Sequence, residues 1–168
     1  KTNLLEAIYL LSTGKSFRTP HLHELIMEGK SFFQLEAEIV SDLVAQTIII
    51  YFDEKQKKAL HNSNALPSFT TLLGIFPSVL HAPSDIELIS GLPALRRRFM
   101  NLHLAQHDPV YVHHLSRFFK ALKQRNFLLK TQNLNSIDVW ENEMAKSASY
   151  LTLKRGKMIA QLNGPANQ

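Results

Sequence analysis

The spacing of apolar residues changes once along the chain, and this change limits the possible folds more than any other feature. Between residues 33 and 39 apolar side chains alternate with Gln34, Glu36 and Glu38, which is the period of a half-buried strand. From about residue 92 onward apolar residues recur at intervals of three and four, which is the period of a helix. The sequence therefore predicts a mixed α/β part followed by an all-α part, and it shows no internal repeat.

The first part is expected to combine helices with short strands. A helix should begin almost at the first residue and stop at Gly14, because glycine readily adopts the backbone conformation that ends helices. Strands are predicted over residues 33–39, 46–52, 57–61 and 77–82, the last ending at Pro83. The break between the first two strands is short, so they should pair antiparallel. A further helix is expected to start at Ser84 and Asp85.

Three helices are predicted in the second part, over about 93–107, 109–129 and 136–163. Asp108-Pro109 is a strong start signal for the second of them, and Gly164-Pro165 is expected to end the third. In the second helix Arg117, Lys120 and Lys123 fall opposite the apolar stripe. This arrangement predicts a packed helix with a basic face.

Composition excludes several classes of protein. The 168 residues are 45% hydrophobic and 20% charged, which is ordinary for a globular chain and excludes a disordered one. The longest strongly apolar run, residues 47–52, is far shorter than the roughly 20 residues of a membrane helix, so no membrane association is expected. The sequence has no cysteine, which excludes disulfides and thiolate metal sites and fits a cytoplasmic location.

Charge is divided unevenly between the two parts. Residues 1–90 carry a net charge of −3, whereas residues 91–168 carry +8. A polyanionic partner such as nucleic acid would explain the basic part, because neutralising phosphates releases counterions and drives binding. A well-solvated helical surface explains it equally simply, and charge alone does not decide between these interpretations.

Lys1-Thr2 stands immediately before the first predicted helix, as the last two residues of a Gly-rich phosphate loop do. In such loops the Lys contacts the β- and γ-phosphates, the Thr hydroxyl binds Mg²⁺, and the helix N-terminus favours the anion. A Lys-Thr pair also occurs by chance, so the pair needs support from the rest of the sequence.

Several motifs in order along the chain provide that support, and together they resemble the RecF family of bacterial recombination-repair ATPases, relatives of the SMC and ABC-type ATPases. The matching segments cover essentially the whole chain up to about Leu162; the main ones are residues 1–9, 14–19, 79–85, 91–93, 96–101 and 122–130. No single motif is decisive, but their order is specific. The chain also begins without methionine, directly in a helix pattern, and is expected to be a fragment of such a protein.

The resemblance implies an incomplete α/β nucleotide-binding lobe with antiparallel strands at 1–91 and an all-α helical lid at 92–168. It implies ATP and Mg²⁺ at Lys1 and Thr2, with Mg²⁺ on Thr2. The full-length protein would be a slow ATPase that dimerises on ATP, clamps duplex DNA next to single-stranded gaps and works with RecO and RecR in gap repair and replication-fork maintenance. The fragment itself should be inactive, because the loop glycines, the signature motif and the Walker B carboxylates lie outside it.

Three positions depart from the family pattern: His81, Ser84 and Asn101 stand where Phe, Glu and Asp are usual. Two of them flank Asp85, which lies in the segment corresponding to the nucleotide-sensing Q-loop. Asp85 is therefore a candidate sensing residue, and it could equally be a carboxylate favoured by a helix N-terminus.

Other interpretations stay open. Arg117, Lys120 and Lys123 are candidate DNA contacts, and Arg96, Arg97 and Arg98 could bind phosphates, although structural pairing of at least one is expected. The paired histidines at 21/23 and 103/107 lack a further ligand in pattern and are weak candidates for a metal site. The competing hypothesis for the whole chain is a nucleotide-independent helical module that binds DNA or protein.

Overall fold

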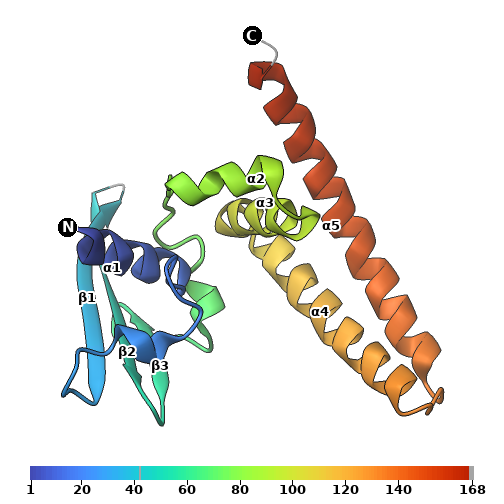
Figure 1. The fold of residues 1–168 in the computed structure, drawn as a ribbon, viewed down its shortest axis with the longest axis horizontal. Helices are drawn as coiled ribbons and strands as arrows, with labels where there is room; N and C mark the ends of the chain where they lie inside the picture. The colour runs from blue at the N-terminus through green and yellow to red at the C-terminus, as the bar shows by residue number, and fades with distance from the viewer. Residues whose placement is uncertain (42, 167–168) are drawn as a thin grey trace. The chain divides into compact units, whose positions relative to one another are not determined.

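The structure, a computed structural model, describes residues 1–41 and 43–166. The chain divides into two compact units, Lys1–Pro83 and Ser84–Gln168. The first unit is α/β and the second is all-α, as the change of hydrophobic period predicts (Figure 1). The predicted domain boundary near residue 91 falls in the loop between helices α2 and α3 of the second unit.

A four-stranded antiparallel sheet forms the centre of the first unit, and its strands lie in the order β1-β2-β3-β4. The strands are β1 (Phe32–Ser41), β2 (Val44–Asp53), β3 (Lys57–His61) and β4 (Asn64–Ala65). The expected strands at 33–39, 46–52 and 57–61 are confirmed. Leu35 of β1 pairs with Ile50 of β2 in the register that places the apolar residues of both strands on one face.

Helix α1 (Thr2–Thr13) packs on the apolar face of this sheet together with the short 3-10 helices η1 (Leu22–Leu25) and η2 (Phe69–Leu72). The core that results consists of seven buried residues: Leu10, Leu11, Ile48, Ile50, Ala59, Phe69 and Leu72. The helix ends where predicted: Gly14 has φ +68° and donates its N–H to Leu10 O at 2.8 Å. The sheet and its helices thus hold the start of α1 at a defined place.

The expected strand at 77–82 is wrong, because this segment is irregular. Val79 is 83% exposed, so the apolar residues there do not enter a sheet. Ser78 instead donates from its hydroxyl to Ser12 Oγ of α1 at 2.7 Å, and Pro77 has no N–H to offer a strand partner. The segment leads into η3 (Pro83–Ile86) and the one-turn helix α2 (Glu87–Ser90).

The second unit contains three longer helices: α3 (Pro93–His107), α4 (Pro109–Lys130) and α5 (Ile137–Ala166). Helices α4 and α5 form a long antiparallel hairpin (Figure 1). All three were predicted, but α5 continues through Gly164 and Pro165 to Ala166. A proline so close to a helix end removes few hydrogen bonds, which explains why the helix does not stop before it. Within the described residues no helix is long and apolar enough to cross a membrane.

Polar side chains tie the three helices together around the fully buried Tyr111. The Tyr111 hydroxyl donates to Asn101 Oδ1 of α3 at 2.6 Å and accepts from Arg155 Nε of α5 at 3.1 Å. Arg155 also donates to Asn101 Oδ1 through Nη2 at 2.8 Å. The amide oxygen of Asn101 therefore accepts from both Tyr111 and Arg155 and joins the three helices.

Asp108 connects α4 and α5 through a second set of polar contacts. Its Oδ1 accepts from Tyr111 N at 3.0 Å and caps α4, while Oδ2 accepts from Tyr150 Oη at 3.0 Å and from Lys154 Nζ at 2.6 Å. The hydrogen bond from Lys154 lowers the pKa of Asp108, with the bonds from Tyr111 N and Tyr150 adding to it. The same ion pair raises the pKa of Lys154.

This ion pair gives a pH-dependent contribution to stability. The folded pKa of Asp108 is depressed, so its contribution is present above the unfolded value of about 4 and is lost as pH falls through the folded value. We expect Asp108→Asn to reduce the urea resistance of the helical unit at pH 7, and the gap to the unmodified chain to close below about pH 4. Fluorescence of Trp140, the sole tryptophan, reports on this unit. A difference in urea resistance between the variant and the unmodified chain that stays constant from pH 7 to pH 3 would contradict the ion pair.

Candidate nucleotide site and basic helix face

The first turn of α1 has the features of an anion-binding helix start. Lys1 is the N-cap residue, and its carbonyl oxygen accepts from Leu4 N at 3.1 Å. No side chain caps the helix, and its first turn holds no acidic residue. The side chains of Lys1 and Thr2 are exposed. An uncapped helix start with a lysine and a hydroxyl beside it favours phosphate, because the unpaired amides and the helix dipole both attract negative charge.

A network of polar side chains connects the first half of α1 to the loop that follows it. Glu6 of α1 is only 6% exposed; its Oε1 accepts from the Ser16 hydroxyl and its Oε2 pairs with Arg18 Nη1 at 3.2 Å. Ser16 Oγ accepts in turn from Arg18 N at 2.9 Å and Thr19 N at 3.1 Å. Arg18 Nη1 also donates to Asn3 Oδ1 at 3.1 Å. These contacts hold a half-exposed guanidinium against the first turn of α1.

A groove of about 640 Å³ lies beside this network. Asn3, Glu6, Arg18 and Thr19 form its polar part, and Leu25 and Phe33 belong to its apolar part. A volume of this size lies within the range of small-molecule sites. The residues that line the groove include Asn3 and Glu6 of α1 but neither Lys1 nor Thr2.

ATP and Mg²⁺ are compatible with these residues. The uncapped first turn offers N–H donors, Lys1 offers a point charge, and Thr2 offers a free hydroxyl oxygen of the kind Mg²⁺ prefers. Among the described residues no group of three or more His, Cys, Asp or Glu could hold a metal by itself, so a metal here would need oxygens from its ligand.

The network predicts unequal effects of its two charged members on stability. Glu6→Ala should lower the free energy of unfolding by about 1–3 kcal/mol, because it leaves the buried Ser16 hydroxyl without its acceptor. Arg18→Ala should cost less than about 1 kcal/mol, since the guanidinium is 53% exposed and its charge is screened. Urea unfolding, with amide exchange in β2 as the probe, measures the free energy of unfolding of both variants. An Arg18 variant as damaging as the Glu6 variant would contradict this assignment.

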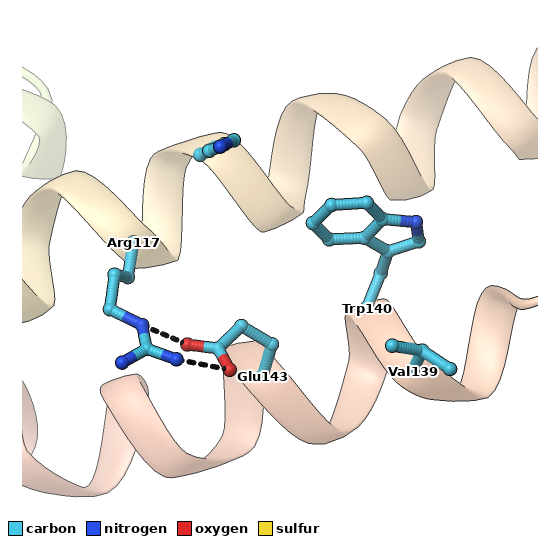
Figure 2. A pocket seen from close by; sticks show the side chains of 5 residues that line it. Arg117, Val139, Trp140 and Glu143 are labelled. Atoms are coloured by element: carbon cyan, nitrogen blue, oxygen red, sulfur yellow. Dashed lines mark hydrogen bonds and ion pairs between the residues drawn. The ribbon is translucent and has the colours of Figure 1, made fainter.

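The candidate DNA residues lie along α4. Arg117 donates to both carboxylate oxygens of Glu143 on α5, through Nη2 at 2.7 Å and through Nε, as Figure 2 shows. This hydrogen bonding lowers the pKa of Glu143. Lys120 and Lys123 are exposed, and neither has an ion pair within the described part of the chain. The structure thus separates a half-exposed arginine that pairs with α5 from two lysines without an ion pair in the described part of the chain, of which Lys120 lines a hollow beside Trp140 and Glu143.

The remaining candidates lie elsewhere in the helical unit. Asp85 is half-buried in the first turn of η3, where a carboxylate is favoured by the helix N-terminus. Arg96 donates from Nη2 to the Gly91 carbonyl oxygen at 3.2 Å, which confirms that one arginine of the run pairs within the fold. Arg97 and Arg98 are exposed.

Sequence reasoning assigned no role to Glu6, Ser16 or Arg18. Glu6 is the only charged residue of α1, and it falls on the face that carries Leu10, so its position among apolar neighbours was the available signal. The partners of Glu6 are 10 and 12 residues away across a turn, and sequence spacing gave no means of pairing them.

The fold and the helix start together define a class of protein: part of an α/β nucleotide-binding lobe joined to a helical domain. No family model matches the chain. The chain is 45% identical to the DNA replication and repair protein RecF of Protochlamydia amoebophila, over 100% of the chain and 47% of that protein. It is 46% identical to the protein of the same name from Chlamydia caviae, over 97% of the chain and 44% of the relative.

Solved structures agree with the sequence relatives. The structure of the recombination mediator protein RecF-ATP in the RecFOR pathway superposes with a TM-score of 0.90 and 28% identity, covering 96% of this chain and 45% of that one. The RecF-ATPrS structure of the same pathway gives the same values. The chain belongs to the RecF family, and it spans a little under half the length of the relatives it matches.

Proposed function

We propose that the chain is part of an ATP-dependent DNA-binding protein that acts in the cytoplasm in recombinational repair of gaps and in replication-fork maintenance. The relatives' names refer to DNA replication and repair, and a relative of the same fold has been solved with ATP. The observation that carries the proposal is the position of Lys1 and Thr2 at the first turn of α1 in a chain that matches these relatives over its whole length. We use the term full-length protein for a chain of the relatives' length that contains these 168 residues.

In this proposal Lys1 contacts the β- and γ-phosphates of ATP, and Thr2 binds Mg²⁺, which would supply charge stabilisation during phosphoryl transfer. Arg18, held by Glu6 and Asn3, adds a second positive charge beside the helix start. Asp85 senses the nucleotide state. Residues 1–91 form the partial ATPase lobe and residues 92–168 the lid.

ATP binding would then drive formation of a homodimer, and the dimer would hold duplex DNA next to single-stranded gaps through Arg117, Lys120 and Lys123. Hydrolysis would be slow and would reset the dimer. RecO and RecR are the expected protein partners, and the pathway named for the solved relatives supports them.

The decisive experiment compares DNA binding by the full-length protein with and without ATP, together with its oligomeric state by sedimentation. ATP should promote both dimerisation and DNA binding. DNA binding of equal strength in both conditions would instead favour a nucleotide-independent helical module, for which the compact second unit would be responsible.

A further inference from the structure

The outer face of α4 combines exposed aromatic rings with unpaired positive charge. Helix α4 contains five basic residues and no acidic one. Residues spaced by three and four positions share one side of a helix, and this spacing unites seven exposed residues on α4: Ser116, Phe119, Lys120, Lys123, Asn126, Phe127 and Lys130. We call these residues the α4 outer face.

The two phenylalanines of this face are unusually exposed. Phe119 is 53% and Phe127 60% accessible, although phenylalanine is normally buried. Within residues 1–41 and 43–166 neither ring stacks on a ring of α5, and Phe119 makes an edge contact with its neighbour Phe118 on α4. Most of the area of both rings is therefore open to a partner.

Some basic residues of α4 pair with carboxylates of α5, and the others do not. Arg117 pairs with Glu143 and Arg125 pairs with Glu141, the latter at 2.8 Å, so α5 neutralises these two arginines. Lys120, Lys123 and Lys130 form no ion pair within the described residues. Lys120 also lines a hollow with Trp140 and Glu143 of α5, so it lies at the edge of the outer face. Because none of the three lysines forms an ion pair in the described part of the chain, the partner of this face should be anionic.

The partner must also offer flat apolar surfaces to the two rings. A DNA duplex presents phosphates but keeps its bases stacked inside, whereas a single strand presents both phosphates and free base faces. Phe119 and Phe127 are eight residues apart, which is about 12 Å along a helix, or roughly three to four nucleotides at the 3.4 Å spacing of a stacked strand. Ring spacing and charge both fit a single strand.

We propose that the α4 outer face binds unpaired nucleic acid, with bases stacked on Phe119 and Phe127 and phosphates contacted by Lys120, Lys123 and Lys130. The inference rests on the proposed DNA-binding function and extends it from duplex to single strand. In a protein that acts at gaps, this face would hold the unpaired strand.

The test uses the full-length protein, a labelled oligothymidine and a duplex of equal length, and binding is measured by fluorescence anisotropy. The double variant Phe119→Ala/Phe127→Ala should weaken oligothymidine binding by about 30-fold or more, since each stacked ring contributes about 1–3 kcal/mol, and should leave duplex binding unchanged. Phe32→Ala is the matched control, because Phe32 is 49% exposed on β1 and should not affect either ligand. Equal weakening for both ligands, or none for oligothymidine, would overturn the proposal.

Three further variants separate stacking from general apolar contact and from charge. Phe119→Trp/Phe127→Trp should preserve binding and Phe119→Leu/Phe127→Leu should not, because leucine is apolar but has no ring face. Replacing Lys120, Lys123 and Lys130 by Gln should lower the salt dependence of oligothymidine binding by roughly 0.7 for each lost contact. Leucine variants that bind as well as wild type would overturn base stacking.

A membrane partner, a failure of this inference and a failure of the proposed function would each give a different result. If the alanine variant loses binding to vesicles of phosphatidylcholine and phosphatidylserine but keeps oligothymidine binding, the face is a membrane surface and the proposal is wrong. If the full-length protein shows ATP-dependent duplex binding that the phenylalanine variants do not alter, and it does not bind oligothymidine, this inference fails and the proposed function stands. Phenylalanine-dependent oligothymidine binding without any effect of ATP on the full-length protein would support the inference and contradict the proposed function.

Discussion

Replacing Lys1 by alanine in the full-length protein is expected to lower ATP affinity about 10- to 100-fold and to remove ATP-driven dimerisation. A hydrogen bond to a charged group contributes roughly 1.5–3 kcal/mol, and each 1.4 kcal/mol is tenfold in affinity. DNA affinity should fall with dimerisation, although Lys1 need not touch DNA. Calorimetry for ATP, sedimentation for dimerisation and anisotropy for DNA measure the three quantities.

Two further substitutions make this prediction specific. Lys30→Ala removes an exposed lysine from the same unit and should leave ATP affinity unchanged. Lys1→Arg should restore little of the ATP affinity that Lys1→Ala loses, because the planar guanidinium does not replace a compact ammonium group at a tight helix start. If ATP strengthens DNA binding, DNA must strengthen ATP binding by the same factor. A Lys1→Ala protein that no longer dimerises but retains full DNA affinity would show that the helical unit binds DNA independently.

Replacing Gly14 by alanine is expected to lower the free energy of unfolding of the first unit by about 2–5 kcal/mol. Gly14 has φ +68°, which is strained for residues with a side chain, at about 1–2 kcal/mol. A Cβ at this position would lie 2.7 Å from Phe69 Cβ and 3.0 Å from Phe69 O, and overpacking of this kind adds about 1–3 kcal/mol. Because Phe69 belongs to the core, relaxation there disturbs the packing under α1.

Gly29 provides the matched control. Its φ is +75°, but a Cβ there would meet nothing within 4 Å, so Gly29→Ala should incur only the conformational part of the loss. Amide exchange in β2 reports on the first unit, while Trp140 fluorescence reports on the helical unit and should not change in either variant. Equal losses for the two glycine variants would show that the contact with Phe69 is unimportant.

The amino-acid sequence by itself determined most elements and their order. Alternation of apolar and polar residues predicted β1, and the three- and four-residue spacing predicted α3, α4 and α5, because each period places apolar side chains on one face that must be buried. The β-branched and aromatic residues at 46–52 predicted β2. Gly14 ended the first helix as expected, since few other residues adopt its backbone conformation easily. The lysine and threonine at the start of α1 were likewise evident from the sequence.

Only the tertiary structure decided which side chains meet. The apolar segment 77–82 resembled a strand, but a strand requires a free partner edge and backbone N–H groups, which local pattern does not reveal. Arg117, Lys120 and Lys123 looked equivalent on one helix until Glu143 of α5 was placed opposite Arg117 alone. Glu6 and Arg18 likewise became partners only when the turn after α1 folded back. Ion pairs between distant residues depend on packing, whereas the hydrophobic period is a local property of the chain.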